Sequence, residues 1–418
     1  MKRSKSPRRT ETIAALDIGT TKVACLIVRR TENGALEVAG VGHQLAKGMK
    51  SGVITDVGEV ETSIVAAVHT AEQMAGSEAI EDVVVSVGGT NIRSRQVSVE
   101  LDVLTEGVSD QDIADIIHEG CGSLASEEAT ILHCFPTQYR LDGVRGLRDP
   151  RGMIGEKLGA DMQVITAKSS YLRNLSHCVA RAQLNVSEYV LNSHASALAV
   201  LDPDEMNLGT TLIDMGGGMT SFSVFLGGRN LYSDVIPIGG NHVTSDIAQG
   251  LSTSMHHAER LKTLHGSAIN STRDGDVMMD VPQLGEREEE DETTTMPRAM
   301  LVGIVRPRME EIFELIRGKL EASGMDKVGR RCVLTGGASQ MIGVGDLATR
   351  MLAKQVRKGT PTPLPGLADS VSGPAFATVI GLLNYVTQRS WEEQILSTAH
   401  ARKRFLPTSI VQWLRENF

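Results

Sequence analysis

Two short segments, about 200 residues apart, combine a carboxylate with glycines and hydroxyls. The first reads Asp17-Ile-Gly-Thr-Thr-Lys22 and the second reads Asp214-Met-Gly-Gly-Gly-Met-Thr220. Glycine lets backbone N–H groups approach phosphate oxygens, and carboxylates can hold a hydrated Mg²⁺ ion. One such segment alone is more often only a turn. Because the pattern recurs, we expect both segments to contribute to one Mg²⁺–nucleotide site, with Asp17 and Asp214 holding the metal through water.

A third glycine-rich segment, Leu334-Thr-Gly-Gly-Ala-Ser339, also follows an apolar run. A glycine pair at the end of a buried strand would let a flat purine lie against the backbone. We therefore expect this segment to contact the adenosine part of a nucleotide. The three segments together are a stronger indication of nucleotide binding than any of them alone.

The elements around the two acidic turns are themselves alike. Strands are expected at Thr12–Asp17 and Val23–Val28 around the first turn, and at Gly209–Asp214 and Met219–Phe225 around the second. Strand–turn–strand is a β-hairpin, unlike the strand–turn–helix of a Walker loop. Two such hairpins predict a duplicated domain.

The rest of the chain alternates between helical and extended patterns. Residues 89–165 combine alternating strand patterns, a helix and a glycine-rich loop, and they are expected to form an inserted α+β subdomain. The acidic run 286–292 is expected to be a solvated loop. The other expected elements are helices at Glu59–Met74, Ser169–Gln183 and Arg308–Leu320, a helical stretch at Gly240–Gly266, and strands at Asp82–Val87, Glu188–Leu191 and Cys332–Thr335.

Length and composition narrow the class of protein. The chain has 418 residues, which suits two domains better than one compact core. Its net charge of −9 argues against nucleic acid as the main partner. No run of about 18 apolar residues is present, so no transmembrane helix is expected. The five cysteines have no paired spacing and are expected to be reduced, buried thiols of a cytoplasmic protein.

The three glycine-rich segments resemble the phosphate and adenosine motifs of the actin, sugar-kinase and DnaK-type chaperone superfamily. In the chaperone branch a glycine pair precedes a helix whose Glu and Lys reach the ribose and adenine. Here Gly239-Gly240 precedes Glu259 and Lys262, which could also be a solvated i,i+3 pair. The resemblance implies binding of Mg²⁺ and ATP by Asp17, Gly19, Thr20, Thr21, Lys22, Asp214, Gly216, Gly217, Gly218, Thr220, Gly239, Gly240, Glu259, Lys262, Gly336, Gly337, Ala338 and Ser339.

Within this superfamily nearly the whole chain resembles the FtsA family of bacterial cell-division proteins. The segments that carry the resemblance are Ser51–Asp56, Ser86–Ile92, Phe135–Asp142, Asp149–Met153, Ile236–Ile247 and Val333–Ser339. The implied fold is α/β: actin-like, duplicated ribonuclease-H-like domains around a nucleotide cleft, plus the inserted subdomain. The expected segments are a basic extension (1–10), a first core domain (11–88, 166–193 and 361–389), the insertion (89–165), a second domain (194–360, with an outer subdomain at about 240–305), a linker (390–406) and an amphipathic helix (407–418).

The resemblance also implies a function in bacterial cell division. The expected protein polymerises with itself, binds the C-terminal tail of the tubulin-like protein FtsZ through residues 240–305, and recruits later division proteins. It would lie peripherally on the cytoplasmic face of the inner membrane at the septum. Hydrolysis of ATP is expected to be slow at most, because Ser193 stands where the chaperone branch has a glutamate, although His194 could substitute.

Other members of the superfamily fit the chain less well. A DnaK-like chaperone would need a substrate-binding domain after the ATPase, and a sugar kinase would need a catalytic carboxylate and sugar pocket that we cannot place. MreB-type actins carry their amphipathic helix at the other end. A type IV pilus assembly scaffold of the PilM type remains the main alternative, because it shares the fold and insertion but lacks a lipid-binding helix of its own.

The last residues predict an amphipathic helix. At 100° per residue, one arc of about 160° contains Ile410, Val411, Trp413, Leu414 and Phe418. Such a helix could dock on the protein's own core. However, it follows a polar stretch and the basic segment Arg402-Lys-Arg404, which is typical of an interfacial membrane anchor. One copy should bind lipid weakly, so the anchor suits a protein that self-associates.

The substitution Trp413→Glu distinguishes the two roles of this helix. It removes an indole worth roughly 1.5–3 kcal/mol when fully buried and adds a carboxylate that resists desolvation. We expect the variant to lose binding to anionic liposomes while its melting temperature and ATP affinity stay near those of the unmodified protein. A helix docked on the core would give the opposite results: the parent protein would not bind liposomes, and the variant would melt several degrees lower.

Overall fold

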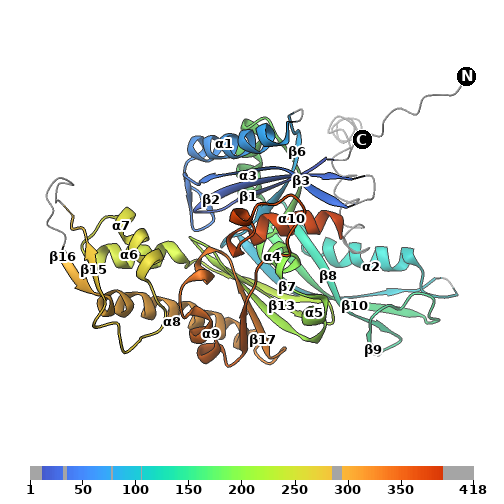
Figure 1. The fold of residues 1–418 in the computed structure, drawn as a ribbon. Coiled ribbons are helices and arrows are strands. Elements are labelled where there is room, and N and C mark those ends of the chain that lie inside the picture. The colour runs from blue at the N-terminus through green and yellow to red at the C-terminus, as the bar shows by residue number, and fades with distance from the viewer. Residues whose placement is uncertain (1–11, 32–34, 77–78, 105, 285–293, 389–418) are drawn as a thin grey trace, which may run out of the picture.

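The structure is a computed structural model that describes residues 12–31, 35–76, 79–104, 106–284 and 294–388 (Figure 1). The predicted basic extension, acidic run, linker and tail helix lie outside these residues. Among the residues described, no helix is long and apolar enough to cross a membrane.

The first half is built on a five-stranded sheet in the order β11-β6-β1-β2-β3. Its strands are β1 (Thr12–Ile18), β2 (Lys22–Arg30), β3 (Leu36–Leu45), β6 (Asp82–Val87) and β11 (Asn185–Leu191). Strands β1, β2 and β3 form an antiparallel meander, whereas β6 and β11 continue the sheet in parallel. Residues 23–28 of β2 are all buried, as expected for a strand that is covered on both faces.

The second half repeats this arrangement. Its sheet has the order β14-β13-β12-β17-β18, where β12, β13 and β14 form the meander and β17 and β18 continue in parallel. The strands are β12 (Thr210–Met215), β13 (Thr220–Leu226), β14 (Arg229–Ile236), β17 (Arg331–Thr335) and β18 (Gln355–Lys358). Asp17 and Asp214 are each the penultimate residue of the first strand of their sheet. The two predicted hairpins are therefore equivalent elements.

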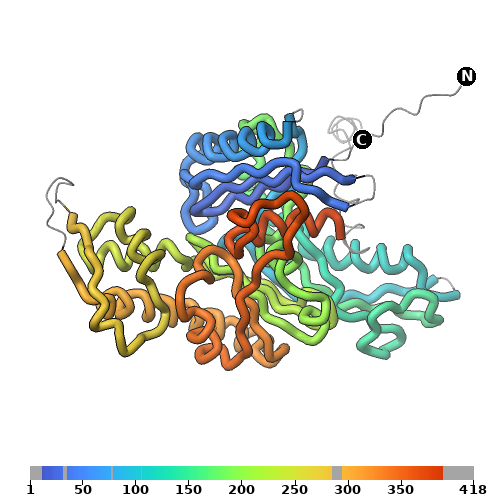
Figure 2. The backbone as a smooth tube through the Cα atoms, in the orientation of Figure 1, coloured from blue at the N-terminus to red at the C-terminus, as the bar shows by residue number. Residues whose placement is uncertain are grey.

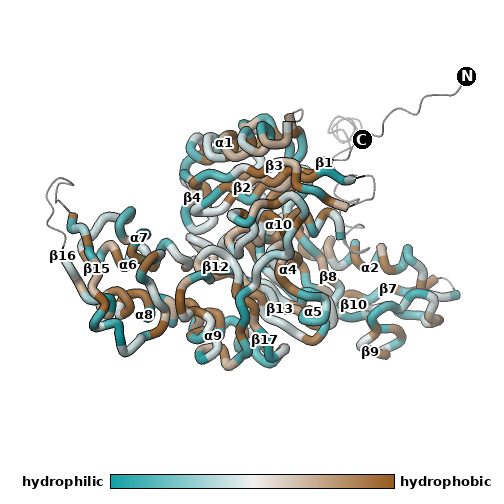
Figure 3. Tube along the Cα trace, viewed as in Figure 1, coloured by the Kyte–Doolittle hydropathy of each residue, from teal (hydrophilic) through white to brown (hydrophobic). Residues whose placement is uncertain are grey.

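Two helices, α4 (Asn192–Val200) and α10 (Ala377–Thr387), pack between the sheets. Their core includes Leu26 from the first sheet and Leu212 from the second, and hydrophobic stretches of α10 are visible in Figure 3. The helices cross closely, because a Cβ at Gly381 would lie only 1.7 Å from the carbonyl oxygen of Ala195. The outer face of the first sheet is covered by α1 (Val57–Ala75) and α3 (Ser169–Arg181).

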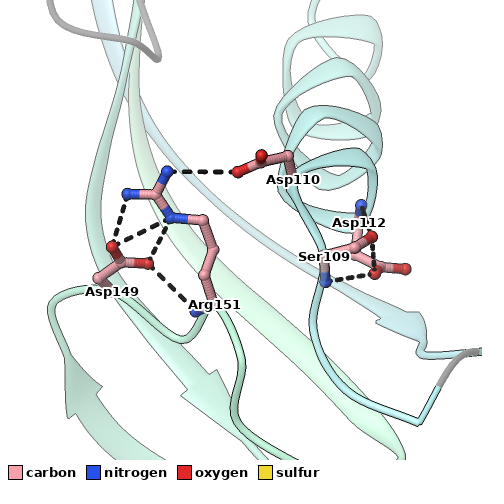
Figure 4. A network of polar contacts seen from close by, with 5 residues as sticks. All are labelled: Ser109, Asp110, Asp112, Asp149 and Arg151. Atoms are coloured by element: carbon pink, nitrogen blue, oxygen red, sulfur yellow. Dashed lines mark hydrogen bonds and ion pairs between the residues drawn. The ribbon is translucent and has the colours of Figure 1, made fainter.

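The insertion forms a separate sheet in the order β7-β10-β8-β9, which is covered by α2 (Asp110–Gly122) and has its own core. Its strands are β7 (Ile92–Asp102), β8 (Ala129–Leu141), β9 (Val144–Leu147) and β10 (Lys157–Lys168). Arg151 connects the loop before β10 to the start of α2, because it pairs with both Asp149 and Asp110 (Figure 4). Ser109 and Asp112 form a capping box at the same end of α2.

An outer lobe lies at the opposite end of the molecule from the insertion (Figure 2). It contains α6 (Gly240–Gly250), α7 (Met255–His265), the pair β15 (Met278–Val281) and β16 (Thr294–Pro297), and the first part of α8 (Arg298–Ala322). The remaining elements are β4 (Met49–Lys50), β5 (Val53–Ile54), α5 (Pro203–Leu208), α9 (Val344–Leu352) and three 3₁₀ turns at Gly337–Gln340, Asp369–Val371 and Pro374–Phe376.

The fold class expected from the sequence is confirmed, but two helices differ from their prediction. The helical stretch at 240–266 is two helices, separated by residues 251–254. The helix expected from Arg308 begins ten residues earlier, at Arg298, and continues through Pro307. Proline removes the hydrogen bond to the carbonyl of Gly303 and places its ring against that carbonyl. Gly303 is exposed, so its carbonyl can bond to water instead. Burial of Leu301, Val302 and Val305 extends the apolar face and offsets this loss.

Candidate functional site

A cleft of about 750 Å³ lies between the two halves. Its walls come from the β1–β2 turn, the β12–β13 turn, the segment after β17, helices α6 and α7, and the residues that lead into α10. This volume is in the range of small-molecule sites in proteins. The elements that the sequence predicted to bind a nucleotide thus surround one cavity.

The two acidic turns touch each other across the cleft. A Cβ at Gly217 would lie 1.8 Å from Thr21 Oγ1, and one at Gly218 would lie 2.6 Å from Thr20 Oγ1. The backbone N–H of Gly240 donates to the carbonyl of Gly216 at 2.9 Å, which joins the second turn to the start of α6. Side chains would push these segments apart, so the glycines are required by close packing.

The partly buried carboxylate of Asp17, the buried carboxylate of Asp214 and one lysine form the centre of the site. Ser86 Oγ donates to Asp17 Oδ1 at 2.6 Å, and Ser196 Oγ donates to Asp214 Oδ2 at 2.7 Å. Burial raises the pKa of Asp17, although the bond from Ser86 and the charge of Lys22 oppose the rise. Burial also raises the pKa of Asp214 to about 6, with a further contribution from Asp17. Both carboxylates would therefore gain from a cation between them.

Lys22 is held by the segment that leads into α10. Its Nζ donates to the carbonyl of Ala375 at 2.6 Å and lies 3.2 Å from the ring centroid of Phe376. Burial lowers the pKa of Lys22 to about 8, and the charges of Asp17 and Asp214 limit the fall. The ammonium group is a compact point charge in a cleft, which suits an anionic phosphate.

The glycine pair after β17 has two different roles. Gly336 has a φ of +84°, and a Cβ there would lie 2.4 Å from Asp214 Oδ1. This glycine is therefore required by backbone conformation and by its contact with the second turn. Gly337 is exposed to the cleft, and a Cβ there would meet only Ala375, at 3.9 Å. Gly337 is thus the position at which an added side chain would enter the cavity.

Glu259 and Lys262 line the same cleft. Lys262 Nζ pairs with Glu259 at 2.6 Å and donates to Thr244 Oγ1 at 2.8 Å and to the carbonyl of Gly240 at 3.1 Å. The Lys262 side chain is only 13% exposed, so the pair is not a freely solvated contact on α7. These contacts fasten α7 to α6 next to Ala338.

Four of the residues predicted to bind ATP do not line the cleft. Thr220 and Ser339 are fully buried and donate to the carbonyls of Ile238 and Gly336. Gly218, in the second turn, packs against Thr20, and Gly239 packs against the backbone of Gly216 and Gly217, so both glycines are buried where a side chain would not fit. The other fourteen predicted residues line the cleft: Asp17, Gly19, Thr20, Thr21, Lys22, Asp214, Gly216, Gly217, Gly240, Glu259, Lys262, Gly336, Gly337 and Ala338.

The structure adds polar residues that the sequence did not indicate. Ser86, Asn192, Asn241 and Thr378 line the cleft, and Thr378 Oγ1 donates to Asp214 at 3.2 Å. Ser193 instead lies in the core, where it accepts a hydrogen bond from Ser223 at 2.8 Å. Ser86 and Asn241 belong to segments that carried the family resemblance, whereas Asn192 and Thr378 lie in none of these segments.

The donor set fits a hydrated Mg²⁺ ion better than a metal enclosed by protein ligands. The described ranges contain no cluster of three or more His, Cys, Asp or Glu side chains suited to a metal. Mg²⁺ keeps several waters and commonly uses one or two carboxylates together with substrate phosphates. Asp17 and Asp214 are in the right place for such binding.

Comparison with known proteins identifies the family. The model of cell division protein FtsA matches residues 211–381, and the model of the SHS2 domain inserted in FTSA matches residues 89–166. Cell division protein FtsA of Rhizobium meliloti (strain 1021) is 42% identical over 428 residues, which cover 98% of this chain and 96% of that protein. Cell division protein FtsA of Escherichia coli (strain K12) is 31% identical over 411 residues, which cover 96% of each.

Solved structures show the same fold at much lower identity. A chain of the PilM-PilN type IV pilus biogenesis complex is 15% identical with a TM-score of 0.66, covering 92% of this chain and all of that one. MreB5 of Spiroplasma citri bound to ADP is 12% identical with a TM-score of 0.53, covering 91% and 99%. These likenesses concern the actin-like fold alone, whereas the full-length identity to the curated relatives is specific. This chain belongs to the FtsA family of cell division proteins.

Proposed function

We propose that the chain binds Mg²⁺–ATP in the cleft and uses it to control assembly into an actin-like polymer that links FtsZ to the membrane. The observation that carries the nucleotide site is the meeting of two acidic glycine turns around Lys22. Lys22 would bind phosphate oxygens, and N–H groups of both turns would surround them. Asp17 and Asp214 would orient water molecules on the Mg²⁺ ion, which supplies positive charge to the phosphates.

Slow hydrolysis is part of this proposal. Asn192, at the start of α4, lines the cleft, whereas the buried Ser193 and His194 do not. An amide can orient water but is not a base, and general-base assistance typically contributes 10²–10⁴-fold to a rate. Asp17 and Asp214 are already engaged by Ser86 and Ser196. The nucleotide would therefore act mainly as a switch for conformation and assembly.

The outer lobe is the proposed docking surface for the FtsZ tail. It exposes several large apolar side chains, among them Met255, Leu264, Met278, Leu284 and Met300. Exposed apolar side chains on one lobe can contribute to binding of a short peptide segment. The proposal has two further parts. Residues 407–418 would bind the membrane at the cytoplasmic face of the septum, and the protein would recruit later division proteins. Both parts rest on the family resemblance.

The substitution Gly337→Asp tests the nucleotide site. It places a side chain and a negative charge in the cleft without strain, whereas the same change at Gly336 would collide with Asp214 and disturb the fold. We expect ATP affinity, measured by calorimetry with Mg²⁺ present, to fall at least about tenfold, or about 1.4 kcal/mol.

Gly303→Asp is the matched control, because Gly303 is exposed on α8 and a Cβ there would meet nothing within 4 Å. The control should bind ATP like the parent, and both variants should melt near the parent temperature. Unchanged affinity in a folded Gly337→Asp variant would refute the site.

The pH dependence of ATP affinity tests the role of Lys22. Its pKa of about 8 means that the ammonium group loses its proton as pH rises through this value, so its attraction for phosphate is present below pH 8 and lost above it. We expect affinity to fall by up to about tenfold per pH unit above pH 8. Lys22→Gln should bind ATP weakly at every pH, without this alkaline fall. A parent protein whose affinity is constant from pH 7 to about 9.5 would contradict the assignment.

Binding of a peptide with the sequence of the FtsZ C-terminal tail tests the outer lobe. The parent should bind it at low salt, and Met278→Glu should weaken binding because it places a charge on the apolar surface. Leu208→Glu changes another exposed apolar residue, on α5 and away from this lobe, and this control variant should bind the peptide like the parent. Absence of peptide binding to the parent would exclude the proposed partner. Equal losses of peptide affinity in both variants would exclude the outer lobe as the binding surface.

A further inference from the structure

The side chain of Met219 crosses from the second acidic turn into a socket in the first half. The socket consists of Gly52, Gly88 and Gly89, which lie in two of the segments that resemble the FtsA family. A Cβ at Gly88 would lie 2.7 Å from Met219 Cε, and a Cβ at Gly52 would lie 3.0 Å from Met219 Sδ. The thioether therefore occupies the space that side chains at Gly52 and Gly88 would take, while Gly89 packs against Gly52.

The socket is fixed to the first acidic turn and to the core of its half. The N–H of Gly52 donates to Thr20 Oγ1 at 3.2 Å, and Tyr171 donates its phenolic hydrogen to the carbonyl of Gly88 at 3.1 Å. Gly52 and Gly88 are packed around Met219 while Thr20 lies against Gly218 of the second turn. Met219 thus belongs to a closed set of contacts that connects both turns.

Met219, Gly52 and Gly88 also line the cleft, together with Tyr171 and Asn192. A methionine is unbranched and adapts to an irregular gap, and it carries no charge that would compete for phosphate or Mg²⁺. Met219 is therefore placed to set the distance between the two turns, although it supplies no charge to a bound ligand.

We propose that Met219 is a positioning residue, which by filling the glycine socket holds the second acidic turn in register with the first so that both turns contact one phosphate chain. This inference rests on the proposed binding of ATP. It gives a reason for glycine at Gly52 and Gly88, in the Ser51–Asp56 and Ser86–Ile92 segments, where a side chain would displace Met219. The precise spacing matters because phosphate contacts require donors from both halves at hydrogen-bond distance.

The first test measures Mg²⁺–ATP affinity of the full chain by calorimetry at pH 7, together with melting temperature. Met219→Ala empties the socket and should weaken ATP binding about tenfold, which is within the range of coupling between contacting residues. Met219→Leu still fills much of the socket and should stay within about threefold of the parent. Both variants should melt within a few degrees of the parent.

A double-mutant cycle tests the contact itself. Gly88→Ala should fold, because its Cβ meets the flexible ends of Met219 and Asn192 rather than backbone. It should weaken ATP binding several-fold in the parent but by a clearly smaller factor in the Met219→Ala background, because one of the two displaced groups is then absent.

Failure of this inference is distinguishable from failure of the proposed function. A parent that does not bind ATP would refute the nucleotide site. A parent that binds ATP, with Met219→Ala within twofold of it, would refute only the positioning role. The positioning role would also be refuted if the effects of Gly88→Ala and Met219→Ala on ATP affinity multiplied independently in the double variant. A Met219→Ala variant whose only defect is a lowered melting temperature would refute it as well.

Discussion

The close approach of the two acidic turns is the constraint on which the site depends. Thr21 and Thr20 lie where side chains on Gly217 and Gly218 would have to be, so the halves meet at this point without intervening atoms. The approach places Asp17 and Asp214 in one cavity, where burial raises the pKa of both carboxyls. Lys22 and the hydroxyls of Ser86 and Ser196 partly compensate these charges, and a hydrated cation would complete the compensation.

Helix α10 joins this electrostatic centre to the hydrophobic core. Thr378, in its first turn, donates to Asp214, while Ala375 and Phe376 just before it hold Lys22. The rest of the helix packs between the two sheets and against α4 through the close contact at Gly381. A change in the charges of the cleft therefore acts directly on the element that both halves share. This is the physical basis on which a bound nucleotide could alter the relation between the halves.

Much of the site was predictable because its chemistry is local. Acid, glycine and hydroxyl stand next to one another in the sequence, and the strand pattern around them is repeated, so both hairpins were correctly expected. Residues that act from a distance were missed: Ser196 and Thr378 reach Asp214 from two different helices and carry no motif. Thr220 and Ser339 were predicted as ligand contacts because they belong to the motifs that resemble the superfamily, but both side chains are buried and do not line the cleft.

The sequence alone indicated the family and its actin-like fold, through segments that resemble known motifs, and it located the three glycine-rich segments of the cleft, because these motifs are made of neighbouring residues. Only the tertiary structure decided which atoms face the cavity. A single step along the chain at the start of α4 turns Asn192 toward the cleft and Ser193 into the core. Likewise Gly336 is required for its backbone conformation, with a φ of +84°, whereas the neighbouring Gly337 faces the cavity. Such distinctions depend on how two halves pack against each other, and packing between segments about 200 residues apart leaves no periodic signal in the sequence.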